Sequence, residues 1–293
     1  MAQWKVWIMG LVLVVLTGCS PMSVFNESAG STTILRADGK LQVLFLDVGQ
    51  GASQLLISPS GKTMLIDAGN NDKEQVMLDY LKQYQITKLD IVIGTHPDAD
   101  HIGGLDKVID QTLVDSIYMP KISSNTRTFE SLLESISNKK LKVQTAKAGL
   151  TLDWDKEVQV EMIAPAAVYD SANNMSAVVK ITYGTTSLLL TGDAEAESEK
   201  DMIKSGVDLS STVLGVGHHG SKTSTSLTFL NKVKPQYAII QSGKDNNYGH
   251  PDKTILSRLK KAGVSVYRND LQGTVSVISD GKNVTIATER KEK

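Results

Sequence analysis

Cysteine is nearly absent from this chain of 293 residues, in which Cys19 is the only one. One cysteine cannot form a disulfide within the chain or build a metal site from thiolates, so both are excluded. A strong charge of either sign is absent as well, because the formal net charge is −1 at pH 7. The protein as a whole therefore has no field that would gather nucleic acid, although a local basic patch could still bind it.

The single cysteine follows an apolar run at the N-terminus. Lys5 precedes the run 6–16, and Thr17, Gly18 and Cys19 follow it. A positive residue, an apolar segment of ~7–15 residues and small residues at its end are typical of a signal peptide, whereas a membrane-spanning helix needs ~20 apolar residues. The sequence around Cys19 also resembles a bacterial lipobox. We therefore expect residues 1–19 to be a lipoprotein signal peptide, and the alternative is a signal anchor with an incidental cysteine.

This signal peptide predicts a secreted protein, anchored to the outer face of the bacterial cell membrane by a lipid on Cys19. Residues 20–40 are rich in Ser, Thr, Gly and Asn and have little periodicity, which is typical of a flexible tether. We expect residues 41–289 to form one domain, which their number allows.

Short apolar strands alternate with helical patterns through this domain, so we expect a layered α/β sandwich with a sheet in each half. We expect strands at 41–48, 53–58, 63–67, 90–94, 113–119, 141–146, 158–163, 177–183, 187–191, 212–216, 236–241, 264–267, 274–279 and 283–287. We expect helices at 73–84, 104–110, 127–137, 194–205, 226–233 and 252–262.

Polar residues begin where several predicted strands end. Asp67 stands at the end of one strand, His96 follows the next, and Asp193 and His218 follow two strands of the second half. All five histidines lie in three short loops of this kind, at 96, 101, 218, 219 and 250. Ligands at the carboxyl ends of neighbouring strands converge on one crevice, so these loops predict a shared site.

The loop 96–101 carries the densest group of candidate ligands, His96, Asp98, Asp100 and His101. Burying such a cluster is costly without cations, because the carboxylates repel each other and lose their hydration. Divalent metals remove that cost. Two metals about 3.5–4 Å apart would hold a hydroxide nucleophile and stabilise an oxyanion. The alternative is an exposed acidic turn without a metal.

The same loop resembles a known family signature. His96-x-Asp98-x-Asp100-His101 is similar to the HxHxDH motif of the metallo-β-lactamase superfamily, with Asp98 in place of the second histidine. Four further motifs resemble the hydrolase domain of ComEC-type competence proteins over about residues 41–286: 45–51, 191–193, 218–221 and 248–251. The resemblance implies a stand-alone lipoprotein with a metallo-β-lactamase-type αββα sandwich, in which two mixed sheets pack face to face with helices outside.

The resemblance also implies roles for the site residues. His96 and Asp98 would bind a first metal, Asp100 and His101 a second, and Asp193 would bridge both. We assign His219 as a further ligand and His218 as a phosphate contact, because consecutive side chains in an extended backbone point opposite ways.

Two other residues complete the expected site. His250 is either a late metal ligand or a general acid, and Asp67 orients a metal-binding histidine, as carboxylates behind the ligands do.

Two departures from the family pattern affect the expected activity. The third-motif histidine is missing, and only residues 173–176 stand near that point. Fewer imidazoles and more oxygens shift the preference from zinc towards manganese or magnesium, so we expect two divalent ions, Zn or Mn. Ala52 stands where the family usually has an aspartate. If that aspartate organises the site, activity here should be weaker.

These observations predict a cell-surface hydrolase that cleaves a phosphodiester, as a nuclease acting on DNA does. Basic residues in or after the motif loops could contact phosphates, although solvated charges explain them equally well: Lys222, Lys244, Arg258, Lys260 and Lys261. One alternative is a phosphoesterase acting on a small or cell-wall group such as phosphorylcholine, and another is a metal-dependent binding protein without turnover. A β-lactamase fits less well, because the first metal position is poor in nitrogen.

Overall fold

The structure is a computed structural model that describes Met1 and residues 38–291. The rest of the predicted signal peptide, including Cys19, and residues 20–37 of the predicted tether lie outside the described residues. Within the part that is described, no helix has the length and the apolar composition needed to cross a bilayer.

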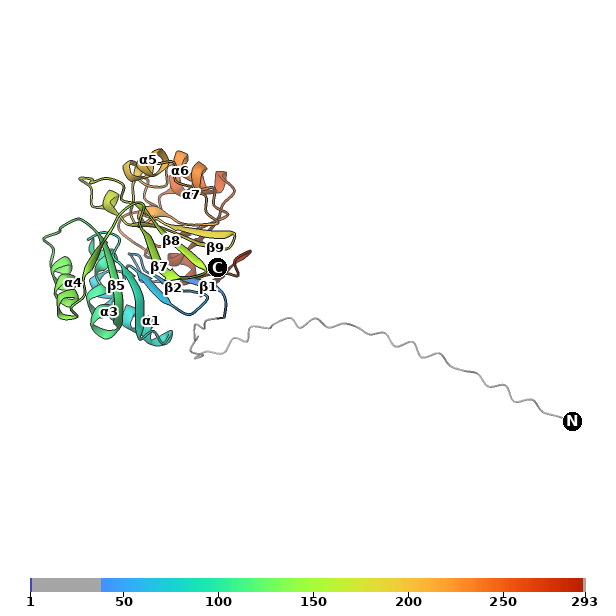
Figure 1. Cartoon of the computed structure of the whole chain (residues 1–293). Helices are drawn as coiled ribbons and strands as arrows, with labels where there is room; N and C mark the ends of the chain where they lie inside the picture. The colour runs from blue at the N-terminus through green and yellow to red at the C-terminus, as the bar shows by residue number, and fades with distance from the viewer. Residues whose placement is uncertain (2–37, 292–293) are drawn as a thin grey trace. The chain divides into compact units, whose positions relative to one another are not determined.

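Two β-sheets pack face to face between two layers of helices (Figure 1). The first sheet begins as an antiparallel meander and continues as parallel strands from β3 to β6. In sheet order it contains β15 (Val284–Thr288), β14 (Val275–Ser279), β1 (Leu41–Phe45), β2 (Gln54–Ile57), β3 (Thr63–Ile66), β4 (Lys88–Ile93), β5 (Leu113–Pro120) and β6 (Val143–Ala146).

The second sheet is antiparallel at one end and parallel from β10 to β13. In sheet order it contains β13 (Ser265–Arg268), β12 (Tyr237–Ile240), β11 (Val213–Gly215), β10 (Thr186–Leu190), β9 (Val178–Tyr183), β8 (Val158–Ala164) and β7 (Thr151–Asp155).

Helices cover the outer face of each sheet. Residues of α1 (Glu74–Gln83), α3 (Leu105–Gln111) and α4 (Arg127–Asn138) share a buried cluster with the first sheet. Residues of α5 (Ala196–Lys204), α6 (Leu227–Val233) and α7 (Lys253–Lys261) do the same with the second sheet. Two single turns, α2 (Ala99–Ile102) and α8 (Asn269–Gln272), lie in loops.

The period of two along each strand explains the layering. In β1, Val43 and Phe45 face the cluster between the sheets, while Leu44 faces the cluster beneath the helices. Successive side chains of a strand point to opposite faces, so a fully apolar strand serves two cores at once. The predicted αββα sandwich of two mixed sheets is confirmed.

The strand β7 was not predicted. Leu152 and Trp154 are buried while Thr151 and Asp153 are exposed, so its alternation rests on only two apolar residues. The predicted strand 41–48 is also shorter than expected, because β1 ends at Phe45 and the chain then turns towards the site.

The topology brings five loops to one edge of the sandwich. They follow β3 and β4 in the first sheet and β10, β11 and β12 in the second, each at the carboxyl end of a strand with a parallel neighbour. Every residue predicted for the site lies in one of these loops. In an α/β fold such edges are where ligand sites form.

Candidate metal centre

The first group of predicted ligands lies on one loop between β4 and α3, with His101 inside the turn α2. Two backbone hydrogen bonds hold this loop. The amide of Ala52 donates to the Asp100 carbonyl at 3.0 Å, and the amide of Ala68 donates to the His101 carbonyl at 2.7 Å. Gly103 permits the close packing, because a Cβ there would collide with the backbone of a neighbouring turn. The loop is thus clamped, which fixes the directions of its side chains.

Asp67 is a fully buried carboxylate that holds His101 in place. Its Oδ2 lies 2.7 Å from His101 Nδ1. Thr95 donates to Asp67 twice, from its amide at 2.8 Å and from its hydroxyl at 2.7 Å. With Nδ1–H of His101 donating to the carboxylate, Nε2 faces the site, where it can bind a cation once its own proton is displaced. The position of Asp67 fits the orienting role that the sequence predicts.

His96 is fully buried, and its two ring nitrogens have different surroundings. Nδ1 lies 3.1 Å from the Thr95 hydroxyl and 3.4 Å from the Ser176 hydroxyl. Nε2 is buried and has no hydrogen-bond partner among the described residues. Buried polar atoms are rarely left unpaired, so this nitrogen marks a position where a cation fits.

Asp193 lies at the centre of the site, in the loop that follows β10. Its Oδ1 is 3.1 Å from His101 Nε2. Its Oδ2 is 3.6 Å from His219 Nε2, 3.7 Å from His218 Nε2 and 3.9 Å from His96 Nε2. One carboxylate therefore faces four imidazoles, which fits the predicted bridge between two metals.

The two consecutive histidines do not have the backbone that the prediction assumed. His218 has φ 50° and ψ 48°, and His219 has φ 54° and ψ 22°, so both are left-handed rather than extended. The premise that their side chains point opposite ways is therefore wrong, and both Nε2 atoms face Asp193. Left-handed residues other than glycine cost of order 1–3 kcal/mol each and cluster at functional sites.

His219 is buried against the first half of the site. Its Nδ1 donates to the Gln241 carbonyl at 2.8 Å, which directs Nε2 to the cluster. Nε2 lies 3.2 Å from Asp100 Oδ2 and 3.2 Å from His101 Nε2. Two imidazole nitrogens and a carboxylate oxygen at this spacing match the donors of one divalent cation.

His218 is more open, with 22% of its side chain exposed. Its Nδ1 lies 3.3 Å from Glu195 Oε1 and 3.2 Å from the Thr223 hydroxyl. Neither Glu195 nor Ser176, which contacts His96, was singled out from the sequence. Glu195 could have been predicted as a site residue from its position two residues after Asp193 on the same loop.

Neighbouring charges shift several pKa values in the cluster. Burial alone would raise the pKa of Asp193, but the adjacent His101 and His219 bring it well below its usual range. Burial would lower the pKa of His101, but Asp193 and Asp67 raise it well above its usual range. Burial opposes ionisation of Asp100 too, yet the hydrogen bond from His219 brings its pKa to about 2. The carboxylates are therefore ionised and ready to bind a cation.

Two overlapping groups of side chains offer ligand atoms within 4.8 Å of one another. One is His96, His101 and Asp193, and the other is Asp100, His101 and His219. His101 is common to both groups, but a single imidazole nitrogen binds only one cation. Asp193 belongs to the first group and its Oδ2 is also 3.6 Å from His219 Nε2, so its carboxylate could bridge two cations. Nitrogen and oxygen donors without thiolate fit zinc or manganese.

Asp98 lies at the rim of this cluster and outside both groups. Its Oδ2 is 3.6 Å from His96 Nε2, and 51% of its side chain is exposed. Its predicted contact with the first metal stays a prediction.

His250 lies on the side of the site formed by the second sheet. Its ring centroid is 5.5 Å from that of His218 and 6.4 Å from that of His219. Burial, followed by the adjacent His218 and His219, lowers its pKa. Its Nδ1 is buried and unpaired among the described residues. These distances place His250 beside the cluster and leave both of its predicted roles open.

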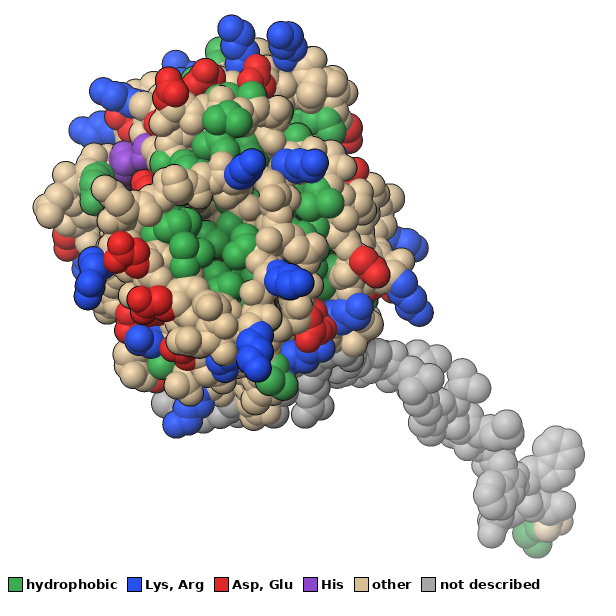
Figure 2. Space-filling view, turned by 60° about the vertical axis from the view of Figure 1, so that its left-hand side comes forward, with side chains coloured by type: hydrophobic (Ala, Val, Ile, Leu, Met, Phe, Trp, Pro, Cys, Tyr) green, Lys and Arg blue, Asp and Glu red, His purple; other side chains and the backbone are tan. Residues whose placement is uncertain are grey.

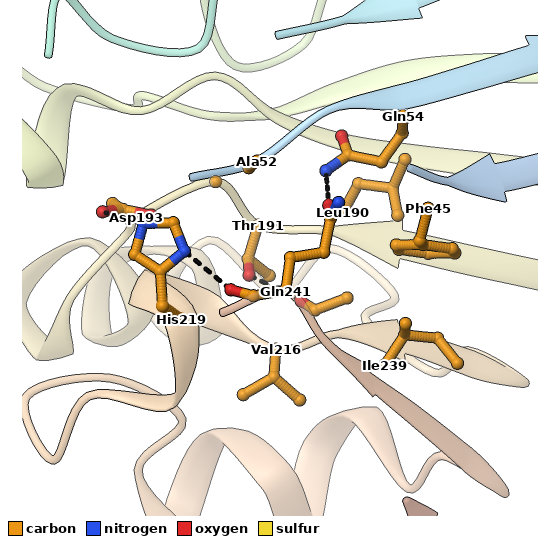
Figure 3. A pocket seen from close by; sticks show the side chains of 12 residues that line it. Phe45, Ala52, Gln54, Leu190, Thr191, Asp193, Val216, His219, Ile239 and Gln241 are labelled. Carbon is orange, nitrogen blue, oxygen red and sulfur yellow. Dashed lines mark hydrogen bonds and ion pairs between the residues drawn. The ribbon is translucent and has the colours of Figure 1, made fainter. Parts of the chain in front are cut away.

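A small cavity lies behind the cluster, between the two sheets (Figure 3). Asp193, His219 and Ala52 line one end, while Phe45 and Ile239 line the other. Water molecules could be centred in only ≈ 20 Å³ of it, which suffices for about one water. A substrate therefore has to approach from the opposite side, where Asp98 and His218 are exposed.

Histidine side chains do reach the surface, among basic, acidic and hydrophobic groups (Figure 2).

The predicted phosphate contacts divide into two sets. Arg258 donates to the Thr225 carbonyl and is therefore a structural tie for the loop after His219. Lys260 and Lys261 lie in the last turn of α7, roughly 10 Å along the helix from the end near His250. Only the exposed Lys222 and Lys244 lie in the loops of the site.

Comparisons with known proteins agree with this geometry. The model of the metallo-beta-lactamase superfamily matches residues 47–244. The chain is 32% identical over 259 residues to ComE operon protein 3 of Bacillus subtilis, covering 82% of this chain and 33% of that protein. It is 30% identical over 241 residues to competence protein ComA of Neisseria gonorrhoeae, covering 81% of this chain and 32% of that protein. The chain thus spans about a third of the length of these relatives.

A solved structure shares the fold. CmlA, a diiron β-hydroxylase from Streptomyces venezuelae, superposes with a TM-score of 0.53 at 13% identity, over 80% of this chain and 53% of that one. At this identity the likeness concerns the fold alone.

Proposed function

Because the chain belongs to the metallo-β-lactamase superfamily, we propose that it is a metal-dependent hydrolase that cleaves phosphodiester bonds in DNA. The observation that carries the proposal is the position of Asp193, whose carboxylate faces four imidazole Nε2 atoms. A cluster of this composition, at the edge where the strands end, is suited to two cations. Hydrolysis is the chemistry that such a pair supports best.

The residues that would hold the cations are those whose ring nitrogens or carboxylate oxygens face Asp193 or adjoin the ones that do. His96 and Asp98 would hold one, Asp100, His101 and His219 the other, and Asp193 both. When bound, two divalent cations lower the pKa of water and stabilise negative charge on a phosphate oxygen.

Charge explains why an anionic substrate needs these cations. Asp98, Asp100 and Asp193 are ionised, since neighbouring histidines lower the pKa of each. Three carboxylates repel a phosphodiester, and two divalent cations reverse the sign of that field. The substrate should therefore bind weakly to the metal-free protein.

His218 is the residue of the cluster best placed to meet the substrate. Its side chain is partly exposed, and Glu195 and Thr223 hold its Nδ1, so its Nε2 is directed at the site. There it would donate a hydrogen bond to a phosphate oxygen or a proton to the leaving group. His250 stands beside it as the second candidate acid.

DNA is the substrate that the sequence resemblance favours. The matched relatives are named for competence, and the ComEC-type motifs imply nuclease chemistry. Lys222 and Lys244 would supply the phosphate contacts, while Arg258, Lys260 and Lys261 would not. We place the enzyme at the outer face of the cell membrane, anchored through Cys19. Loss of a fatty-acid label in Cys19→Ser, with the wild type labelled, would support that address.

The function is tested by assaying residues 38–291 on single-stranded DNA, duplex DNA and a chromogenic phosphodiester with Mn²⁺, Zn²⁺, Mg²⁺ or EDTA. We expect cation-dependent cleavage by the wild type and by Asp153→Ala, an exposed substitution on β7, and none by Asp193→Ala. Cleavage of the small ester alone would favour a phosphoesterase. No turnover by protein that retains its metals would leave a binding protein.

A further inference from the structure

Tyr248 is unusual among the aromatic residues of this protein. It is 70% exposed, and every other Phe, Tyr or Trp that the structure describes is buried or partly buried. Within the described part of the chain its hydroxyl has no hydrogen-bond partner. The exposed ring thus contributes little to packing, although it lies beside the metal centre.

The loop that carries Tyr248 is held in a defined shape by Asn246. The Asn246 side-chain amide donates to the Gly243 carbonyl at 2.9 Å and to the His250 carbonyl at 2.6 Å. Its Oδ1 accepts from the amides of Tyr248 and His250, each at 3.1 Å. Gly243 in turn donates to Gln50 Oε1 at 3.1 Å, which ties the loop to the turn after β1. These bonds position an exposed ring.

The ring of Tyr248 lies parallel to that of His250, with the centroids 5.9 Å apart and an interplanar angle of 21°. From His250 the series of rings continues to His218 at 5.5 Å, and His218 Nε2 is 3.7 Å from Asp193. Tyr248 therefore lies beside His250 with most of its side chain exposed, two rings away from the carboxylate that would bridge the cations.

We propose that Tyr248 is a stacking platform for an unpaired base of single-stranded nucleic acid, next to the phosphodiester at the metal centre. This inference rests on the proposed function and adds a specificity-determining residue to it. In proteins that bind single strands, bases stack on exposed aromatic rings. This stacking tolerates any nucleotide sequence, because every base has a π-face. Paired bases of a duplex are already stacked, so the platform selects single strands. The exposed Lys244, on the same loop, is available to the backbone phosphates.

The test compares a single-stranded oligonucleotide with the same backbone carrying abasic sites, in the Mn²⁺-loaded protein. For Tyr248→Ala we expect kcat/KM on the intact strand to fall roughly 5- to 100-fold through KM, as loss of one base stack predicts. On the abasic strand the variant should match the wild type. Tyr248→Phe keeps the ring and should keep the preference.

An equal loss on both strands would overturn the proposal, because it would mean that Tyr248 merely supports His250. No loss on either strand would overturn it as well. Fluorescence anisotropy separates this outcome from failure of the proposed function. A wild type that cleaves neither strand, yet binds the intact strand more tightly than the abasic one through Tyr248, would leave the platform standing and remove the nuclease.

Discussion

The two sheets contribute to the metal centre in different ways. The first sheet supplies four candidate ligands from one clamped loop, 96–101, backed by the buried Asp67. The second sheet supplies Asp193, the histidine pair and His250 from three separate loops. The first half is held by a carboxylate, whereas the second is held by a backbone carbonyl at His219 and by the more exposed Glu195 at His218. The first half therefore fixes geometry, and the second closes the site and faces the substrate.

Asp193 joins the halves, so its loss should have the largest effect. Asp193→Ala removes the central carboxylate, which faces imidazoles from both sheets, and we expect bound metal to fall from two ions per chain to fewer than one. Elemental analysis after gel filtration measures this directly. Asp153→Ala, an exposed substitution away from the site, is the control for metal lost during purification. Two ions retained by Asp193→Ala would mean that the halves bind metal independently.

The histidine pair tests whether the second half divides into a ligand and a substrate contact. His219 is buried against Asp100 and His101, so His219→Ala should lose metal and activity together. His218→Ala should keep its metal and lose rate by ~10²–10⁴-fold, the usual contribution of a positioned acid or base. Metal content and turnover are measured on the same samples. Metal loss in His218→Ala alone would reverse the two roles.

Metal affinity should depend more on Asp67, which orients His101 within the first half, than on Ser176, which contacts His96 from the second half. Asp67→Asn keeps an oxygen near His101 but removes the charge, and we expect metal affinity to fall ~10- to 100-fold. Ser176→Ala removes a neutral contact of 3.4 Å from His96, and a smaller loss should result. Competition with a chromogenic chelator gives both affinities. A larger loss for Ser176→Ala would contradict the ranking.

The last and smallest expected effect is a decrease in metal affinity as the pH falls. Asp193 and Asp67 outweigh burial and raise the pKa of His101 well above its usual value, so in the metal-free protein its Nε2 is protonated near pH 7. A cation must displace that proton, and affinity should therefore fall about tenfold for each unit that the pH decreases below this pKa. Calorimetry in buffers of different ionisation enthalpy counts the protons released. Binding at pH 7 without proton release would show that His101 is neutral beforehand.

The sequence predicts the first half of the site better than the second. His96 to His101 are contiguous, and one strand end places them together. Gln241 orients His219 through its backbone carbonyl, which any residue type has, so no side-chain signal marks it. The left-handed backbone at 218–219 could not be predicted either, because residues other than glycine rarely adopt that conformation.

The fold follows from pattern for similar reasons. Strands with a run of three apolar residues, such as β4 and β10, are evident because successive side chains of the run enter two cores. The strand β7 has two buried side chains before its last residue, and its pairing with β8 is what makes it a strand. Tertiary pairing of this kind cannot be read from a short alternating segment.

Anomalous diffraction from crystals grown with Mn²⁺ tests the central claim most directly. The account predicts two peaks about 3.5–4 Å apart, one on each side of the Asp193 carboxylate, with His96 Nε2 beside one and His219 Nε2 beside the other. Peaks at other carboxylates, with none within bonding distance of Asp193, would contradict it.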